Sequence, residues 1–163
     1  MSYLVRKINK AKWFQFDILK FDEVSADAVT SCLKTTQNTL SVWHIESEEA
    51  IENAVLAIVS NQDHIETVDF VILETQTLID HNLNIVFTPG DTPVKSLVET
   101  HRDVTDLSYT KLGHVKEHLV QRIRVEKIKR YTASSIKKIL SKALSDGLIQ
   151  REDLKESIRG KIS

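Results

Sequence analysis

The segment HVKEH, residues 114 to 118, brings two histidines and a glutamate within one helical turn. On a helix this H-x-x-E-H spacing can supply two zinc ligands and a general base. A catalytic zinc needs a third protein ligand, and the acidic residues that follow form no second recognisable motif. The apolar positions around the segment recur at helical spacing: Leu112, Val115, Leu119 and Ile123. This stripe predicts that His114 and His118 project to the opposite, exposed side, so no metal site is favoured and these two are the least implausible ligands.

Other familiar catalytic signatures are incomplete. The remaining histidines of interest lie on different predicted elements: His44, His64, His81 and His101. No serine or cysteine lies in a nucleophile-elbow context, and Cys32 lies on the predicted inner face of a short helix, as a buried small side chain does. With four glycines, neither phosphate-binding glycine motif can be written. The segment TPGD, residues 88 to 91, predicts a β-turn, with a ligand site at the end of a strand as the alternative. We expect no cofactor.

Basic residues are concentrated between positions 122 and 142. They are Arg122, Arg124, Lys127, Lys129, Arg130, Lys137, Lys138 and Lys142. This density could neutralise several phosphates, so these residues are the candidates for binding nucleic acid or another anion. The stretch SSIKKILSKALSDGLI, preceded by VEKIKRYT, resembles the second helix of winged-helix domains, which implies DNA binding through a helix-turn-helix. The resemblance lacks a wing, because only 14 residues follow Ile149 and they predict a helix.

The two parts of the chain have opposite charge. Up to Thr110 there are 8 Lys and Arg against 17 Asp and Glu, a balance of −9, and from Lys111 onward there are 14 against 6, a balance of +8. One interpretation is an acidic surface beside a tail that seeks external anions. The other is that the two parts attract one another within one fold, and the sequence leaves both open.

Aromatic residues give a further hint of partner binding. Trp13, Phe14 and Phe16 are close together, and Trp43 lies in a predicted strand. Aromatic side chains are frequent hot spots of protein interfaces, although they are more often part of the core. The sequence leaves open whether Trp13 and Phe14 are exposed.

The pattern of elements predicts an α+β fold, with a small mixed sheet and packed helices followed by a helical C-terminal subdomain. The opening segment, residues 3 to 19, predicts an edge strand or a loosely packed entry segment because it mixes β-branched residues with lysines. Strands are predicted at 40–45, 68–74 and 84–87. Long helices are predicted after Pro93, which divides the chain into an α/β region, residues 1–92, and a basic helical region, residues 93–163, within what could be one continuous domain.

The composition of the chain indicates its cellular compartment. A single cysteine indicates a reducing compartment, with the cytoplasm as the expected location. The longest apolar run is AVLAIV, residues 54 to 59, so no membrane partner is expected. We rank three functions: a protein-binding module of the accessory, immunity or antitoxin type, then a small nucleic-acid-binding regulator, then an enzyme of unfamiliar type. Another protein is the expected partner, and the oligomeric state is left open.

Overall fold

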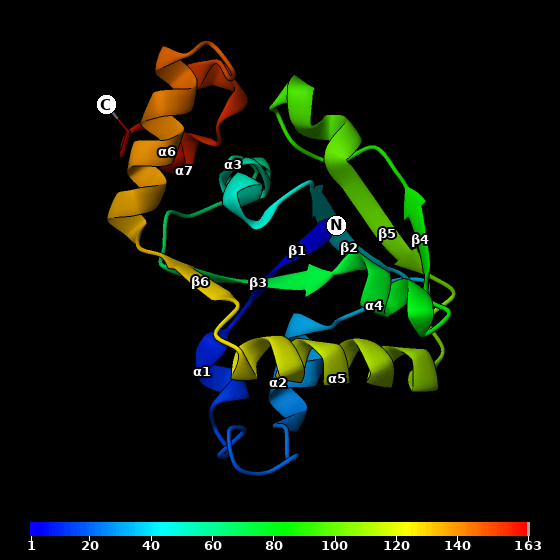
Figure 1. Ribbon diagram of the computed structural model, residues 1–163. Helices are drawn as coiled ribbons and strands as arrows, with labels where there is room; N and C mark the ends of the chain where they lie inside the picture. The colour runs from blue at the N-terminus through cyan, green and yellow to red at the C-terminus, as the bar shows by residue number, and fades with distance from the viewer. Residues whose placement is uncertain (163) are drawn as a thin grey trace.

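The computed structural model describes residues 1–162 and has an α+β fold built on one six-stranded sheet (Figure 1). The strands are β1 (Tyr3–Ile8), β2 (Leu40–Ile45), β3 (Val68–Glu74), β4 (Asn84–Phe87), β5 (His101–Thr105) and β6 (Ile128–Tyr131). Their order in the sheet is β4-β5-β2-β1-β3-β6, and all five pairings are antiparallel. The predicted α+β class is confirmed. The sheet was expected to be mixed but is antiparallel, because every pair of neighbouring strands runs in opposite directions.

Helices cover both faces of the sheet. The α-helices are α1 (Lys10–Trp13), α2 (Ala26–Cys32), α3 (Ile51–Val59), α4 (Thr75–Asp80), α5 (Tyr109–Arg124), α6 (Ala133–Ser145) and α7 (Glu156–Arg159). The 3₁₀ helices are η1 (Glu48–Ala50), η2 (Lys95–Thr100) and η3 (Arg151–Asp153). One face packs against α3, α6, α7 and η2, and the other against α1, α2, α4 and α5 (Figure 1). Alternate side chains of the central strands enter these two separate cores, as the two-residue period of a strand requires.

Strand β1 lies inside the sheet, between β2 and β3. The prediction of an edge strand or a loose entry segment is wrong for these residues. Leu4 and Val5 are completely buried on opposite faces. Arg6 donates to the carbonyl oxygens of Cys32 at 2.7 Å and Ser41 at 2.6 Å, so its charged end reaches polar groups from within the sheet. The basic residues that suggested an edge are therefore compatible with a central strand.

Strands β5 and β6 lie after Pro93, where the sequence predicted only helices. Their burial explains why they were missed. In β5 only His101 and Val104 are buried, and in β6 no residue is. Strand β6 is an edge of the sheet, so its side chains need no apolar alternation. The sheet is continuous across the predicted boundary between residues 1–92 and 93–163.

Local sequence patterns account for several elements. Strand β2 has the predicted bounds, and the buried residues of α3 include Ile51, Ala54, Val55 and Val59, which recur at three- and four-residue steps. Helix α6 begins where Thr132 caps it, since the Thr132 hydroxyl accepts a hydrogen bond from the backbone N–H of Ser135 at 3.2 Å. Gly147 follows its C-terminus with a φ of 72°, a conformation that favours glycine. These elements are set by residues within a few positions of one another.

Candidate protein-interaction surface

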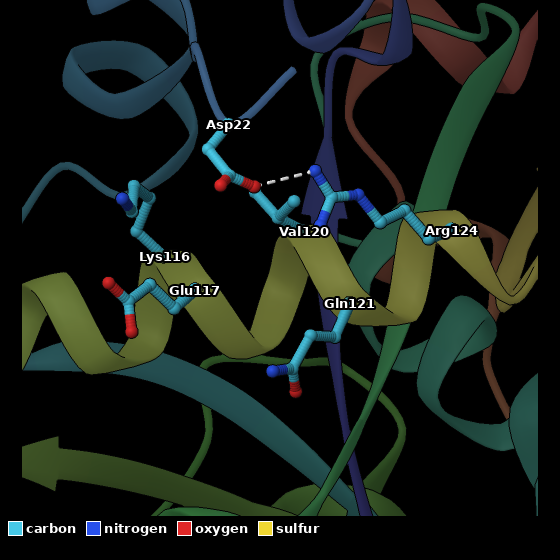
Figure 2. Close-up of a pocket in the computed structure, with 6 residues that line it drawn as sticks. All are labelled: Asp22, Lys116, Glu117, Val120, Gln121 and Arg124. Atoms are coloured by element: carbon cyan, nitrogen blue, oxygen red, sulfur yellow. Dashed lines mark hydrogen bonds and ion pairs between the residues drawn. The ribbon is translucent and has the colours of Figure 1, made fainter. Parts of the chain in front are cut away.

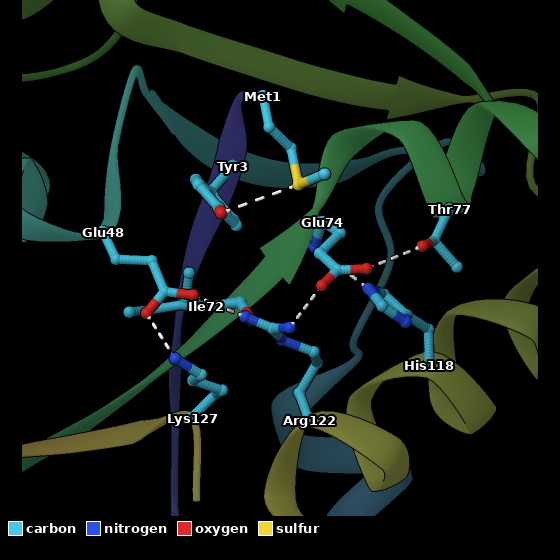
Figure 3. A network of polar contacts seen from close by, with 9 residues as sticks. All are labelled: Met1, Tyr3, Glu48, Ile72, Glu74, Thr77, His118, Arg122 and Lys127. Atoms are coloured by element: carbon cyan, nitrogen blue, oxygen red, sulfur yellow. Dashed lines mark hydrogen bonds and ion pairs between the residues drawn. The ribbon is translucent and has the colours of Figure 1, made fainter. Parts of the chain in front are cut away.

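Arg122, the first of the predicted anion-binding residues, is buried, and Figure 3 shows it among carboxylates of the same chain. Its side chain is only 7% exposed. The guanidinium donates to carboxylate oxygens of Glu74 at 2.6 Å and Glu48 at 3.0 Å, and to the carbonyl oxygen of Ile72 at 2.7 Å. Three internal acceptors leave this side chain little capacity for an external phosphate.

Lys127 joins the same network from the turn after α5 (Figure 3). Its Nζ donates to Oε2 of Glu48 at 2.7 Å, so Glu48 bridges two cations. The hydrogen bond from Lys127, helped by the one from Arg122, holds the pKa of Glu48 below its ordinary value against the opposing effect of burial. Glu48 is thus kept ionised as the centre of a three-charge cluster.

Three further predicted basic residues bind carboxylates of this chain. The pairs are Arg124 with Asp22 at 2.8 Å, Arg130 with Asp69 at 2.8 and 3.0 Å, and Lys142 with Asp146 at 2.9 Å. Except for Asp146, all these carboxylates belong to the acidic part of the chain. Of the two interpretations of the charge asymmetry, the contacts favour attraction within the fold. The other three predicted residues, Lys129, Lys137 and Lys138, are exposed.

The region that resembles a winged-helix domain is arranged differently in space. Helix α6 follows the strand β6, not a second helix joined by a short turn. Its inner residues Ile136, Leu140 and Ala143 are buried in the core that includes α3. After α6 come η3 and α7, where a winged-helix domain has its hairpin. The resemblance is therefore confined to the helix itself.

The two histidines of HVKEH have different environments. His118 is 4% exposed, and its Nε2 accepts a hydrogen bond from the backbone N–H of Glu74 at 2.9 Å. The prediction that His118 projects outward is wrong, because the buried face of α5 is wider than the apolar stripe and includes two polar residues, His118 and Arg122. Burial lowers the pKa of His118. His114 stacks on His81 with ring centroids 4.6 Å apart. Within residues 1–162, no group of three or more His, Cys, Asp or Glu could hold a metal ion.

The aromatic residues separate into buried and exposed sets. Trp13 and Trp43 are buried, at 0% and 7% exposure. The segment between α1 and α2, residues 14 to 25, is here called the aromatic loop. Four of its apolar side chains are exposed: Phe14 at 39%, Phe16 at 49%, Leu19 at 60% and Phe21 at 61%. On sequence grounds, Phe14 and Phe16 were considered as interface residues, but Leu19 and Phe21 were not. The sequence feature that could have identified these two is an apolar segment without a helical or strand period.

The aromatic loop is held to the body at several points. Ile18 is completely buried in the core beside α5. Arg124, at the end of α5, donates to the carbonyl oxygen of Ile18 at 3.0 Å and to that of Phe21 at 3.2 Å, and its ion pair with Asp22 is visible in Figure 2. At the far end of the loop, the Ser25 hydroxyl donates to the side chain of Gln15 at 2.7 Å. The exposed apolar side chains are thus presented by a loop with fixed anchors.

A cavity of about 390 Å³ lies beside the loop. It is lined by Lys10, Phe14, Leu19, Ile123, Arg124, Glu126 and Ile128. Four of these are apolar and three are charged, and the ammonium of Lys10 lies 5.4 Å from the centroid of the Phe14 ring. Apolar and charged side chains side by side are a usual composition of protein interfaces.

One polar chain that the sequence did not predict joins β2 and β5 with Thr88, the residue that follows β4. The Ser41 hydroxyl contacts Nε2 of His101, and Nδ1 of His101 lies 3.1 Å from the carbonyl oxygen of Thr88. The Thr88 hydroxyl donates to Asp103 at 2.9 Å. In the neutral imidazole, the contact with the carbonyl oxygen places the proton on Nδ1, because a carbonyl oxygen only accepts, and Nε2 then accepts from Ser41. Ser41 lies inside β2 opposite Asp103, however, and not on the strained turn at a strand end that exposes a hydrolase nucleophile.

Comparison with known proteins adds no assignment. No family model, curated protein or solved structure matches this chain. Across residues 1–162, no helix combines the length and the apolar character needed to cross a bilayer.

Proposed function

We propose that this protein is a cytoplasmic, non-enzymatic protein-binding module of the accessory, immunity or antitoxin type, and that it docks through the aromatic loop. The observation that carries the proposal is the exposure of Phe14, Phe16, Leu19 and Phe21, four apolar side chains within eight residues. Clustered apolar side chains on a protein surface usually mark a site that a partner covers.

The anchoring of the loop supports this function. Binding by a loop that must first become ordered loses part of the interaction free energy to conformational entropy. Here the buried Ile18 and the hydrogen bonds from Arg124 already fix the loop. The adjacent cavity can receive an apolar side chain of the partner, and Lys10, which lines it, can pair with an acidic one. The expected partner is therefore a protein that presents an apolar segment flanked by acidic residues.

A nucleic-acid-binding regulator has less support. Five of the eight basic residues that would bind phosphates are paired with carboxylates of the same chain. Breaking these pairs would oppose binding. Lys129, Lys137 and Lys138 are exposed, and three side chains supply few of the phosphate contacts that sequence-specific binding uses.

The test combines partner capture with a matched pair of variants. Phe16→Ser together with Phe21→Ser removes two exposed rings from the loop, while Tyr109→Ser removes a ring that is 93% exposed on α5. Each variant is immobilised as a full chain and exposed to extract of the native host, and a protein retained in stoichiometric amount is then purified. Its affinity for each variant is measured by calorimetry.

We expect one stoichiometric partner for the wild type and for Tyr109→Ser. Loss of a central aromatic residue of an interface costs about 2 kcal/mol or more, a factor of about 30 in affinity. The double loop variant should thus bind at least about 100-fold more weakly. Equal binding by the double loop variant, or the absence of any stoichiometric partner, would refute the proposal, and steep salt-dependent binding to DNA would favour the regulator.

A further inference from the structure

The two edges of the sheet are protected to different degrees. Strands β4 and β6 are the edges, and alternate residues of an edge strand direct their N–H and C=O groups away from the sheet. Strand β6 carries Lys129 and Arg130, whose charges oppose pairing with another strand. Strand β4 reads Asn-Ile-Val-Phe and carries no charge. It is the edge that lacks this protection.

The side chains of β4 are also suited to contact. Phe87 is 54% exposed, and Ile85 and Val86 are half-buried. Ile85 packs against the core on the α5 side of the sheet, and Phe87, two residues further along the strand, shares that face. Figure 1 shows β4 at the outer margin of the sheet, beyond β5. An uncharged strand with an exposed aromatic ring at a free edge is a template for a further strand.

We propose that β4 pairs in antiparallel fashion with β4 of a second copy of this chain, so that the two sheets become continuous across a two-fold axis. Identical strands face one another in such a dimer, so a charge on the strand would meet its own copy. A strand that pairs with its own copy should therefore carry no charge. Strand β6 contains a lysine and an arginine and does not meet this requirement, whereas β4 does. The proposal does not depend on the function of the aromatic loop.

The symmetry also fixes the register. Residues directly opposite in an antiparallel pair point to the same face, so the two-fold axis must pass beside a residue that faces its own copy. Centring the axis at Val86 places Val86 opposite Val86 and Ile85 opposite Phe87 of the second copy. Centring it at Ile85 would place the polar Asn84 opposite Val86. The register centred at Val86 places apolar residues opposite one another at each central position, and we assign this register.

A four-residue strand forms a small interface, and small interfaces belong to weak, reversible complexes. We expect a dissociation constant on the order of 10 to 100 µM. The full chain is examined by sedimentation equilibrium from low micromolar concentration up to about ten times this dissociation constant. Val86→Lys places two like charges opposite one another, and Tyr109→Lys adds the same charge at an exposed position on α5, outside β4. Circular dichroism establishes that each variant is folded.

We expect a concentration-dependent dimer for the wild type and for Tyr109→Lys, and at least a tenfold weaker dimer for Val86→Lys. The register is tested with Val86→Cys and the exposed Ser134→Cys, each treated with a short bismaleimide. Dimers should be cross-linked in the first variant and not in the second, since Cys32 is buried in both. A wild type that remains monomeric throughout, or equal dimerisation of Val86→Lys and Tyr109→Lys, overturns the proposal. The double variant Phe16→Ser with Phe21→Ser should dimerise normally, which separates this interface from the aromatic loop.

Discussion

Replacement of Arg122 by methionine should destabilise the protein strongly. The Arg122 side chain is only 7% exposed, and its guanidinium donates three internal hydrogen bonds, to Glu48, Glu74 and the carbonyl of Ile72. Methionine has a similar length and fills much of the volume, so the substitution removes the charge and the hydrogen bonds with little loss of packing. The carboxylates remain in place, and Glu74 loses its cation.

The magnitude follows from what is left unpaired. Removing one partner of a buried ion pair costs about 3 to 5 kcal/mol, because the remaining charge is desolvated without compensation. Glu48 keeps its hydrogen bond from Lys127, and Glu74 is 34% exposed, so water relieves part of the penalty. The carbonyl of Ile72 loses the hydrogen bond that it accepts from Arg122, which adds about 1 kcal/mol. We therefore expect a loss of about 3 kcal/mol, at the lower end of the range.

Urea unfolding followed by the fluorescence of Trp13 and Trp43 measures this loss, since both rings are buried in the folded state. With a slope of about 2 kcal/mol/M for a protein of this size, the midpoint should fall by about 1.5 M. Lys142→Met is the matched control, because Lys142 forms an exposed pair with Asp146 and should change stability by about 0.5 kcal/mol or less. A loss below about 1 kcal/mol for Arg122→Met would show that the internal charge network does not stabilise the fold.

Three further predictions concern single residues. The pKa of His118 is lower in the folded state than in the unfolded chain. As the pH falls, His118 is therefore protonated at a higher pH in the unfolded chain, and stability should decrease from about pH 6.5 down toward the folded pKa. An NMR titration of the imidazole and urea midpoints between pH 7 and pH 5 check this, and a His118→Gln variant should lack that part of the decline. Gly90→Ala should lower the free energy of unfolding by about 1 to 3 kcal/mol, because the new Cβ would overlap the ring of Trp43. Gly113→Ala should raise it by about 0.5 to 1 kcal/mol, because a Cβ there meets open space within a helix. Thermal melts distinguish the two. Ser41 should stay unmodified by a fluorophosphonate, as read by intact mass, and a stoichiometric adduct there would revive the enzyme interpretation.

Gly90 also illustrates a prediction that the structure revises. The segment TPGD predicted a β-turn, yet the backbone N–H of Gly90 donates to the carbonyl of Val98 at 2.9 Å, in a stretch without an assigned turn. A Cβ at this position would lie 2.8 Å from Cβ of His101. Glycine is required by the close approach of the backbone to β2 and β5, a need that nearby sequence does not reveal.

Elements stabilised by local interactions were predictable. Strand β2 and helices α3 and α6 follow from apolar periods and, for α6, from a cap at Thr132 and a stop at Gly147. Residue spacing of two, three or four positions carries that information, so no distant contact is needed to read it. Strands β5 and β6 could not be predicted in this way, because a partly exposed strand is stabilised mainly by pairing with a neighbour that is remote in sequence.

By itself, the sequence determined the α+β class, the burial of Cys32 and the opposite charges of the two parts of the chain. Tertiary structure alone decided where those charges go: Arg122 meets Glu48 across 74 residues, and Arg124 meets Asp22 across 102. It also decided that Phe16 is exposed while the nearby Trp13 is buried. The physical reason is that burial and ion pairing depend on which segments pack together, and that choice is made by the whole fold.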